Sequence, residues 1–445
     1  MFKPDSSSAA PPSLPRSRPR VLSPFAIVAI CIGADLAVLV ALGLVGVGVF
    51  HAQAQSVRFP APPLAVAEAA PVLQAEPRAA RPTGDTAGVT YRNHKLKADN
   101  GEPWSLHVLK IDRSRADLGF YSAHARDRVL AVSHIWEQAA AVPPELGEAI
   151  AGINGDFYVR DQPTYAGDPR GLQIMNGELI SAPDTVCVWF DTNGHPHLDD
   201  VKGLFYATWP DGRKTPFGLN QQRRPNSAVL FTPTLGTSTR ATGGSELILE
   251  KDGDGPWLPL QAGQNYRARV RDVATNGNTR IEPGTMVLSL GAPLLGDLPE
   301  LKPGLVLQLS TTTTPNLTGV KVAIAGGPAL IQNGKAFTLK TRPADAPRGY
   351  AEDSKYARHP RAAVGWSPTH VYFIVIDGRQ PDLSMGMKLA ELAEYFASLG
   401  CTDAINLDGG KSAQLWFNGH IMNKPVNGED TVASSLLLVR KAQGR

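Results

Sequence analysis

The sequence has few cysteines and no compact set of metal ligands. It contains three cysteines among 445 residues, and no Cys/His group has the spacing of a zinc site. No segment has the ligand spacing of an EF-hand loop either. We therefore predict neither a metal nor another cofactor. Cys31 lies in an apolar run, which leaves Cys187 and Cys401 as either a disulfide pair outside the cytoplasm or two buried thiols.

The main body of the chain also lacks a concentrated block of positive charge. The net charge is +3 and charged residues make up 19% of the chain. Nucleic-acid-binding proteins usually present a basic face, so we expect no nucleic-acid partner. The hydrophobic fraction of 42% is ordinary for a globular protein, and the length allows a large core.

Long apolar runs are absent except near the N-terminus. Residues 25–50 are almost wholly apolar and are interrupted by Asp35. This length is enough for a helix to cross a bilayer, which requires about 20 residues. The preceding segment, residues 1–24, is basic and rich in proline and serine, which places the N-terminus in the cytoplasm.

The apolar run has two interpretations, a signal anchor and a cleavable signal peptide. Ala52-Gln53-Ala54 resembles a processing site, but the run exceeds the usual apolar core of a signal peptide. The length favours an uncleaved anchor in a bacterial inner membrane, with the main domain periplasmic or extracellular. Residues 51–88 are rich in alanine and proline and predict a semi-extended linker.

Residues 89–441 contain short β-branched runs separated by glycine, proline and Asn-Gly, which predicts an α+β fold with a strand-rich mixed sheet and few helices. Asn-Gly between apolar runs predicts hairpins at 173–180 and 329–337. Apolar residues at helical spacing predict a helix over 388–399. Further predicted elements are strands at 106–111, 362–367, 371–376 and 404–407 and a helix around 131–140, with Val132, Ile135 and Trp136 on one side.

Two parts of this body carry predictions about arrangement. A helical crossover between strands 371–376 and 404–407 usually makes such strands parallel. Residues 206–226 are polar, which predicts a solvated surface loop, with a flap over a site as the alternative.

Four segments place polar residues at the ends of predicted strands, and three of them also contain glycine. They are Asn154-Gly155-Asp156-Phe157-Tyr158, His359-Pro360-Arg361, Asp377-Gly378-Arg379 and Asn406-Leu407-Asp408-Gly409-Gly410-Lys411-Ser412. Strand ends are positions where scaffolds present catalytic groups. Arginine pairs can grip phosphate, and carboxylates near them stay ionised. Each segment alone is also consistent with a plain turn or a structural ion pair.

The last segment imitates two known motifs without matching either. Gly410-Lys411-Ser412 looks like the end of a phosphate-binding loop, but Ile405 stands where that motif requires glycine. A strand-like run follows it instead of a helix. Ser412 is also not part of a G-x-S-x-G elbow, because Gln414 takes the place of the second glycine.

Five motifs in order resemble the phosphodiester glycosidase family. They are Ile153–Tyr158, Ala325–Leu330, His359–Gly365, Ile376–Arg379 and Asn406–Ser412. The resemblance extends over roughly residues 88–440. The chain departs from the family at Lys411, where a third glycine is usual, and at Glu429-Asp430-Thr431, near which an arginine is usual.

The resemblance implies hydrolysis of a sugar-1-phosphodiester at the anomeric carbon. It implies Asp408 as the leading catalytic carboxylate and Asp377 as the second. The remaining predicted residues bind phosphate, sugar hydroxyls or water: Arg361, Arg379, Asn154, Asp156, Gly409, Gly410 and Ser412. Given the predicted location, the expected substrate is a cell-envelope or exopolysaccharide glycan. The alternatives are a non-catalytic glycan-binding or polysaccharide-assembly protein and a phosphodiesterase that cleaves the P–O bond.

Overall fold

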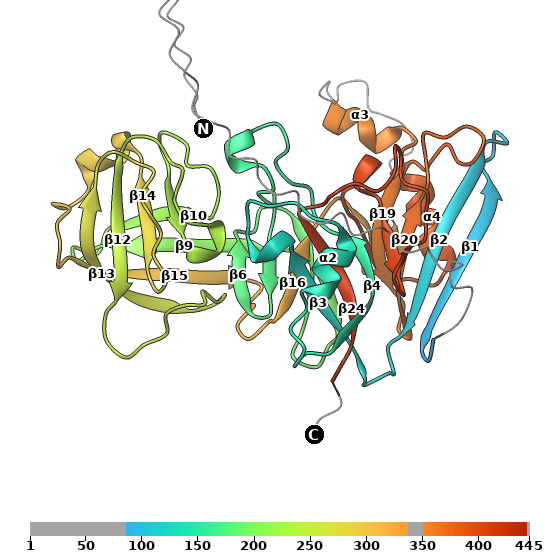
Figure 1. Ribbon diagram of the computed structural model, residues 1–445, viewed down its shortest axis with the longest axis horizontal. Coiled ribbons are helices and arrows are strands. Elements are labelled where there is room, and N and C mark those ends of the chain that lie inside the picture. Colours follow the sequence, from blue (N-terminus) through green and yellow to red (C-terminus); the bar gives the residue numbers. More distant parts are fainter. Residues whose placement is uncertain (1–85, 337–349, 443–445) are drawn as a thin grey trace, which may run out of the picture. The chain divides into compact units, whose positions relative to one another are not determined.

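The computed structural model describes residues 86–336 and 350–442, all within one compact unit, Arg78–Arg445 (Figure 1). The predicted membrane span and most of the predicted linker lie outside the described residues. Among the helices of the described ranges, none is long and apolar enough to cross a bilayer. Strands dominate the unit, and the predicted α+β fold is confirmed.

The largest open sheet contains most of the strands whose ends were predicted to present site residues. Its strands, in spatial order, are β1 (Val89–Lys97), β2 (Pro103–Asp112), β20 (His370–Ile376), β19 (Arg361–Trp366), β21 (Asp403–Asn406), β17 (Ala329–Gln332) and β18 (Lys335–Ala336). Both β20 and β21 are antiparallel to β19, which lies between them. The predicted parallel direction of β20 and β21 is therefore correct, although they are not direct neighbours. Their C-terminal ends meet at the same sheet edge.

Two smaller sheets pack against one face of this sheet. One contains β6 (Glu178–Ser181), β5 (Gln173–Met175), β16 (Val322–Ala325), β7 (Val186–Phe190) and β8 (Pro196–Asp200); the other contains β23 (His420–Ile421), β22 (Leu415–Phe417), β4 (Glu148–Asn154), β24 (Ser434–Arg440) and β3 (Leu118–His124). A core that includes Phe373, Ile324 and Leu436 joins the three sheets. Near-continuous burial of these strands explains why they are apolar along their length instead of alternating.

Residues between β8 and β16 form a closed barrel. Its strands, in order around the barrel, are β10 (Lys214–Leu219), β11 (Ala228–Phe231), β14 (Met286–Leu290), β12 (Ser245–Lys251), β13 (Asn265–Ala274), β15 (Val306–Thr314) and β9 (Lys202–Thr208). The expectation of a loop at 206–226 was correct for only part of the segment, because β9 extends to Thr208 and β10 spans Lys214–Leu219. Exposed and buried residues alternate along β10, so Lys214 and Pro216 face solvent while Thr215, Phe217 and Leu219 are buried.

Helices are short and few in the described ranges. The α-helices are α2 (Ile135–Ala140), α3 (Tyr350–Tyr356) and α4 (Leu389–Ser398), and the 3-10 turns are η1 (Ala125–Asp127), η2 (Pro163–Tyr165), η3 (Pro233–Leu235), η4 (Ala292–Asp297) and η5 (Gly410–Ser412). Helix α4 covers the outer face of the large sheet through Leu392 and Phe396, as its spacing predicted. In α2, Ile135 is buried but Trp136 is 46% exposed, so the predicted common apolar side was wrong for Trp136.

The two predicted hairpins are confirmed. Asn176 and Asn333 have φ values of 48° and 51°, as a two-residue Asn-Gly hairpin turn requires. Phe337, the last residue of the second predicted hairpin, lies outside the described residues.

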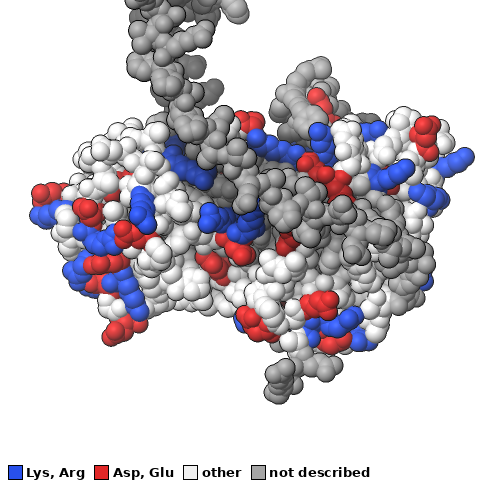
Figure 2. All heavy atoms as spheres, viewed as in Figure 1, with Lys and Arg blue, Asp and Glu red and all other residues white. Residues whose placement is uncertain are grey.

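Cys187 and Cys401 are buried free thiols in different core clusters, so they do not form the disulfide that was one of the two interpretations. On the face shown in Figure 2, basic and acidic side chains are interspersed.

Candidate active site

Four of the five family-like segments meet through backbone and side-chain contacts at one edge of the sheets, and the fifth packs against them. Asp408 N donates to Gly155 O at 3.1 Å, and Gly410 N donates to Pro360 O at 3.0 Å. Asn406 Nδ2 donates to Gly327 O at 2.8 Å. Gly378 in turn packs directly against the backbone of Pro360. The convergence that the sequence could not show is therefore present in the structure.

The converging segments surround a cavity of about 890 Å³. Its lining includes Asp156, Arg379, Asn406, Asp408 and the Gly409–Lys411 turn. Gly409 is needed at this turn because an added Cβ would lie 2.7 Å from Pro360 O. The charged residues in the lining are Asp156, Arg160, Asp161, Arg170, Asp184, Lys355, Arg361, Arg379, Asp408 and Lys411. Cations outnumber carboxylates among them, which favours an anionic ligand.

Asp408 is held from behind and presents one oxygen to the cavity. Ser412 Oγ donates to Asp408 Oδ2 at 2.6 Å, and Asn154 Nδ2 donates to Asp408 O at 2.6 Å. The backbone N–H of Gly409 also hydrogen-bonds to the Asp408 carboxylate. Burial raises the pKa of Asp408 above its ordinary value, although the Ser412 hydrogen bond and Arg160 oppose the shift. The predicted ligands Asn154 and Ser412 are buried behind Asp408 and hold it in place.

Arg160 lies directly beside this carboxylate, and the sequence interpretation missed it. Its guanidinium donates to Ser412 Oγ and lies 3.5 Å from Asp408 Oδ2 and 3.7 Å from Asp430 Oδ2. It also stacks over the Tyr158 ring at 4.5 Å. Arg160 follows the Asn-Gly-Asp segment by four positions, which is a usable sequence signal. Its pairing with Asp430 spans too much of the chain for spacing to reveal.

Asp156 is a second carboxyl group in the cavity wall. Its oxygens accept from Phe157 N at 2.7 Å and from Gly171 N at 2.8 Å. Burial raises the pKa of Asp156 to about 7, and the nearby charge of Asp408 adds to this effect, whereas the backbone donors oppose it. At neutral pH, Asp156 is therefore partly protonated and adds less negative charge to the cavity than a free carboxylate would.

Arg379 is the cationic side chain most clearly placed in the cavity by the predicted motifs. It is exposed, and its backbone has φ 57°, a left-handed conformation that costs energy in a non-glycine residue. A Cβ added at Gly410 would lie 3.5 Å from Arg379 Nη1. Arg379 Nη2 lies 3.3 Å from His359 Nδ1, and burial together with Arg361 and Arg379 lowers the pKa of His359 to about 4. Neutral His359 can accept from Arg379 and hold it over the Gly410 turn.

Arg361 lines the cavity, but much of its guanidinium serves the fold. Its Nε donates to Met387 O at 2.9 Å, and its Nη2 donates to Ser354 O at 2.6 Å and Ala357 O at 2.9 Å. These bonds connect β19 to the residues around α3. A two-nitrogen grip on phosphate, as predicted, would require these bonds to break, so this geometry favours a structural role.

Asp377 requires a correction, because its carboxylate does not line the cavity. It accepts from His107 Nε2 at 2.8 Å, Ser105 Oγ at 2.9 Å and Lys424 N at 2.7 Å. Burial raises the pKa of Asp377, but these donors outweigh burial and hold its pKa below the ordinary value. Asp377 ends β20 and anchors the turn that carries Arg379. Its position favours a positioning role over the predicted catalytic one.

Asn406 offers an acceptor to which the sequence interpretation assigned no specific role. Its Nδ2 donates to Gly327 O, which fixes the amide. Asn406 lines the cavity, and its buried Oδ1 has no donor among the described residues. Buried polar atoms are rarely left unpaired, so this oxygen is suited to accept a hydroxyl from a ligand.

The barrel holds the loop that carries Arg160. Tyr165 is buried, and its hydroxyl donates to Thr239 O at 2.6 Å. Arg240 Nη1 donates to Thr164 O at 2.7 Å. Both hydrogen bonds join the segment between β4 and β5 to the segment between η3 and β12. The position of Arg160 therefore depends on a part of the chain in which the sequence analysis predicted no site residue.

Comparisons with known proteins agree with the motif resemblance for the C-terminal part of the chain. Residues 265–439 match the family described as phosphodiester glycosidase. The matched region contains Arg361, Arg379 and Asp408, whereas Asn154 and Asp156 precede it. The structure is thus a strand-rich domain whose C-terminal part is similar to a family of glycosidase-type hydrolases. Over residues 265–439 the chain carries a phosphodiester glycosidase domain.

Solved structures share the fold at low sequence identity. A Synechocystis protein superposes with a TM-score of 0.62 at 16% identity, over 79% of this chain and 62% of its own, less than two thirds of that protein. A Burkholderia pseudomallei protein gives a TM-score of 0.57 at 24% identity, over 76% of this chain and 74% of its own. The catalytic domain of zebrafish N-acetylglucosamine-1-phosphodiester alpha-N-acetylglucosaminidase gives 0.43 at 12% identity, over 80% and 83%. None of the curated proteins matches the chain.

Proposed function

We propose that this protein hydrolyses a sugar-1-phosphodiester at the anomeric carbon of a cell-envelope or exopolysaccharide glycan. The observation that carries the proposal is the position of Asp408. One of its oxygens is held by Ser412, and the other faces a cavity in which cationic side chains predominate. A carboxylate beside an anion-binding surface suits a substrate that joins a sugar to a phosphate.

In the proposed reaction the phosphate binds on the cationic side of the cavity. Arg379, Arg160 and Lys411 are exposed cations in the lining and can contact phosphate oxygens. The leaving phosphate is already a stable anion, so it needs less proton donation than an ordinary glycoside. These cations would stabilise the charge that grows on the phosphate as the C–O bond breaks.

The sugar then lies against the carboxylate wall. Asp408 Oδ1 would stabilise the oxocarbenium-like centre, or act as nucleophile or base. Asn406 Oδ1 would accept a sugar hydroxyl. Ser412 and Asn154 would keep Asp408 in position without touching the substrate.

Solvent oxygen-18 tests the bond that breaks. Hydrolysis of a sugar-1-phosphodiester in labelled water should place the label in the released sugar. Label in the phosphate product would mean P–O cleavage and would refute a glycosidase mechanism.

Substitution of Asp408 tests the assigned carboxylate. Asp408→Asn keeps the size of the side chain and an oxygen that Ser412 can donate to, so we expect a folded protein. We expect kcat/KM to fall by at least about 100-fold, as for loss of a group acting in the transition state. Asp184→Asn removes an exposed carboxylate from the same lining and is the matched control. Full activity of the folded Asp408→Asn protein would show that the site is wrongly assigned.

A further inference from the structure

A second hollow lies at the opposite ends of strands that reach the candidate active site. Its volume is about 570 Å³, within the range of about 300–1,000 Å³ typical of ligand sites. Phe190 and Val322 line this hollow, whereas Val186 at the other end of β7 and Gly326 just after β16 line the active-site cavity. The two sites are roughly 13 Å apart along β16, at about 3.3 Å per residue.

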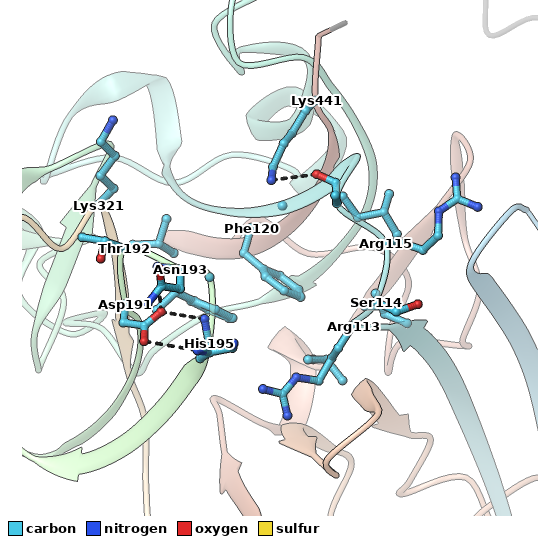
Figure 3. Close-up of a pocket in the computed structure, with 18 of the residues that line it drawn as sticks. Arg113, Ser114, Arg115, Phe120, Asp191, Thr192, Asn193, His195, Lys321 and Lys441 are labelled. Carbon is cyan, nitrogen blue, oxygen red and sulfur yellow. Dashed lines mark hydrogen bonds and ion pairs between the residues drawn. The ribbon is translucent and has the colours of Figure 1, made fainter.

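An aromatic side chain forms part of the base of the hollow. The ring of Phe120 is half-buried and stacks on Phe190, with centroids 4.4 Å apart and an angle of 19° between the rings. Figure 3 shows Phe120 between the loop of Asp191 and His195 and the turn of Arg113, with Lys441 on the side opposite Arg113. A fixed aromatic surface suits the C–H groups of a sugar ring, because ring faces carry partial negative charge.

The carboxylates around the hollow are largely occupied. Asp191 accepts from the backbone N–H groups of Asn193 and His195 at 2.9 and 2.8 Å. Asp112 accepts from Ser114 N at 2.8 Å. Each carboxylate is thus engaged by groups of its own turn, Asp112 also by the Ser114 side chain and Asp191 by the His195 ring, so the hollow is suited to binding.

The cations of the hollow favour an anionic ligand. Arg115 is paired with Asp117 at 2.8 Å, but Arg113, Lys321 and Lys441 remain in the lining. Among the described residues, the Arg113 guanidinium donates only to Ser367 O, through Nη1 at 2.8 Å, and Lys441 Nζ donates only to Ala116 O at 2.9 Å. Both side chains thus have further N–H groups for a ligand.

The hollow continues into a neighbouring one, which suits an extended ligand. The neighbour has a volume of about 390 Å³ and shares Phe120, Lys321 and Lys441 with the first. It extends past Asn176 to Ala442. Neither hollow shares a lining residue with the active-site cavity.

We propose that these joined hollows form a second, non-catalytic binding site for an anionic glycan chain. A sugar ring packs on Phe120, and phosphate or carboxylate groups of the chain contact Arg113, Lys321 and Lys441. The site does not require the chain to be hydrolysed, so it stands apart from the proposed reaction.

The test measures binding to the full-length Asp408→Asn protein. The probe is a fluorescent oligosaccharide of phosphodiester-linked sugars, and a neutral dextran oligosaccharide of equal length is the control ligand. Hydrogen exchange locates the binding: the probe should slow exchange of residues 113–120 and 191–195. Lys321→Gln combined with Lys441→Gln should weaken binding at this site by about tenfold and remove that protection.

A matched variant controls for general electrostatic attraction. Lys214→Gln with Lys251→Gln removes two exposed lysines from the barrel and should leave the protection unchanged. Equal effects of the two double variants, equal binding of neutral dextran, or protection confined to the active-site segments would each overturn the proposal. This test can fail independently of the proposed reaction. If the wild-type protein binds the glycan at this site but hydrolyses no sugar-1-phosphodiester, only the proposed function is refuted.

Discussion

At the scale of single residues, the site separates groups that line the cavity from groups that hold them in position. Asp408 and Arg379 face the cavity, whereas Ser412, Asn154 and His359 fix their positions. Asp377 supports the Arg379 turn from outside the lining. Residues adjacent in one motif therefore have different roles, and the direction of each side chain decides which.

The protonation of Asp156 should control substrate binding across neutral pH. Its pKa is raised to about 7 by burial and by Asp408, so it loses its proton as the pH rises through that value. The new charge would repel a bound phosphate, so we expect KM to rise several-fold above pH 7. Steady-state kinetics over a pH series would measure this rise.

The Asp156→Asn variant should lack this rise in KM, and Asp184→Asn should retain it. Asparagine loses one of the two backbone hydrogen bonds of Asp156, so circular dichroism must first show that the variant is folded. A pH profile of KM that is identical in wild type and Asp156→Asn would contradict the prediction.

The sequence predicted the residue types of the site better than their roles. Asp408 and Arg379 were identified because each follows a strand and is adjacent to glycine. Asp377 has the same pattern, and Arg361 lies at the other end of a strand, yet hydrogen bonds with distant segments engage both elsewhere. Arg160 was missed because its partner Asp430 comes from a distant segment. The local sequence pattern indicates where strands end, but it does not indicate which distant groups will bury a given side chain.

At the scale of elements, the barrel and the sheets cooperate through the loop between β4 and β5. Tyr165 and Thr164 connect this loop to residues before β12, and Arg160 lies on the same loop. The barrel thus acts as a support for one wall of the active site. The strand pairs and α4 were predictable from local spacing, whereas barrel closure depends on long-range pairing such as that of β15 with β9.

Loss of the Tyr165 hydroxyl should loosen this support. Tyr165→Phe removes the bond to Thr239 O and leaves that carbonyl unpaired, so we expect the free energy of unfolding to fall by about 1–3 kcal/mol. We also expect KM to rise more than kcat falls, because Arg160 would be held less firmly. Urea unfolding and kinetics would measure both. Tyr206→Phe on β9 is the control, and equal effects of the two variants would argue against a specific support.

At the scale of the whole molecule, the N-terminal segment is predicted to set where the domain works. The predicted anchor, residues 25–50, lies outside the described residues, so its role stays a prediction. An envelope location would bring the cavity to glycans instead of cytoplasmic metabolites. We expect the full-length protein to remain in the membrane fraction after an alkaline carbonate wash, because an inserted helix resists removal of peripheral proteins.

Protease added outside the inner membrane should cleave in residues 51–88 and release a folded fragment that retains hydrolysis. Deleting residues 25–50 should move the protein out of the membrane fraction. A full-length protein washed off by carbonate, or a mature N-terminus just after Ala54, would instead indicate a peripheral protein or a cleaved signal peptide.

The placement of two ligand sites at opposite ends of β7 and β16 would make the affinity for a substrate depend on its chain length. A short oligosaccharide could occupy one site at a time, whereas a chain long enough to pass around the sheet edge could occupy both. For such a chain the second contact is intramolecular, and its effective concentration depends on chain length. Apparent affinity should therefore rise abruptly once chains reach a threshold length, and the protein would favour intact polymers over the fragments that it releases.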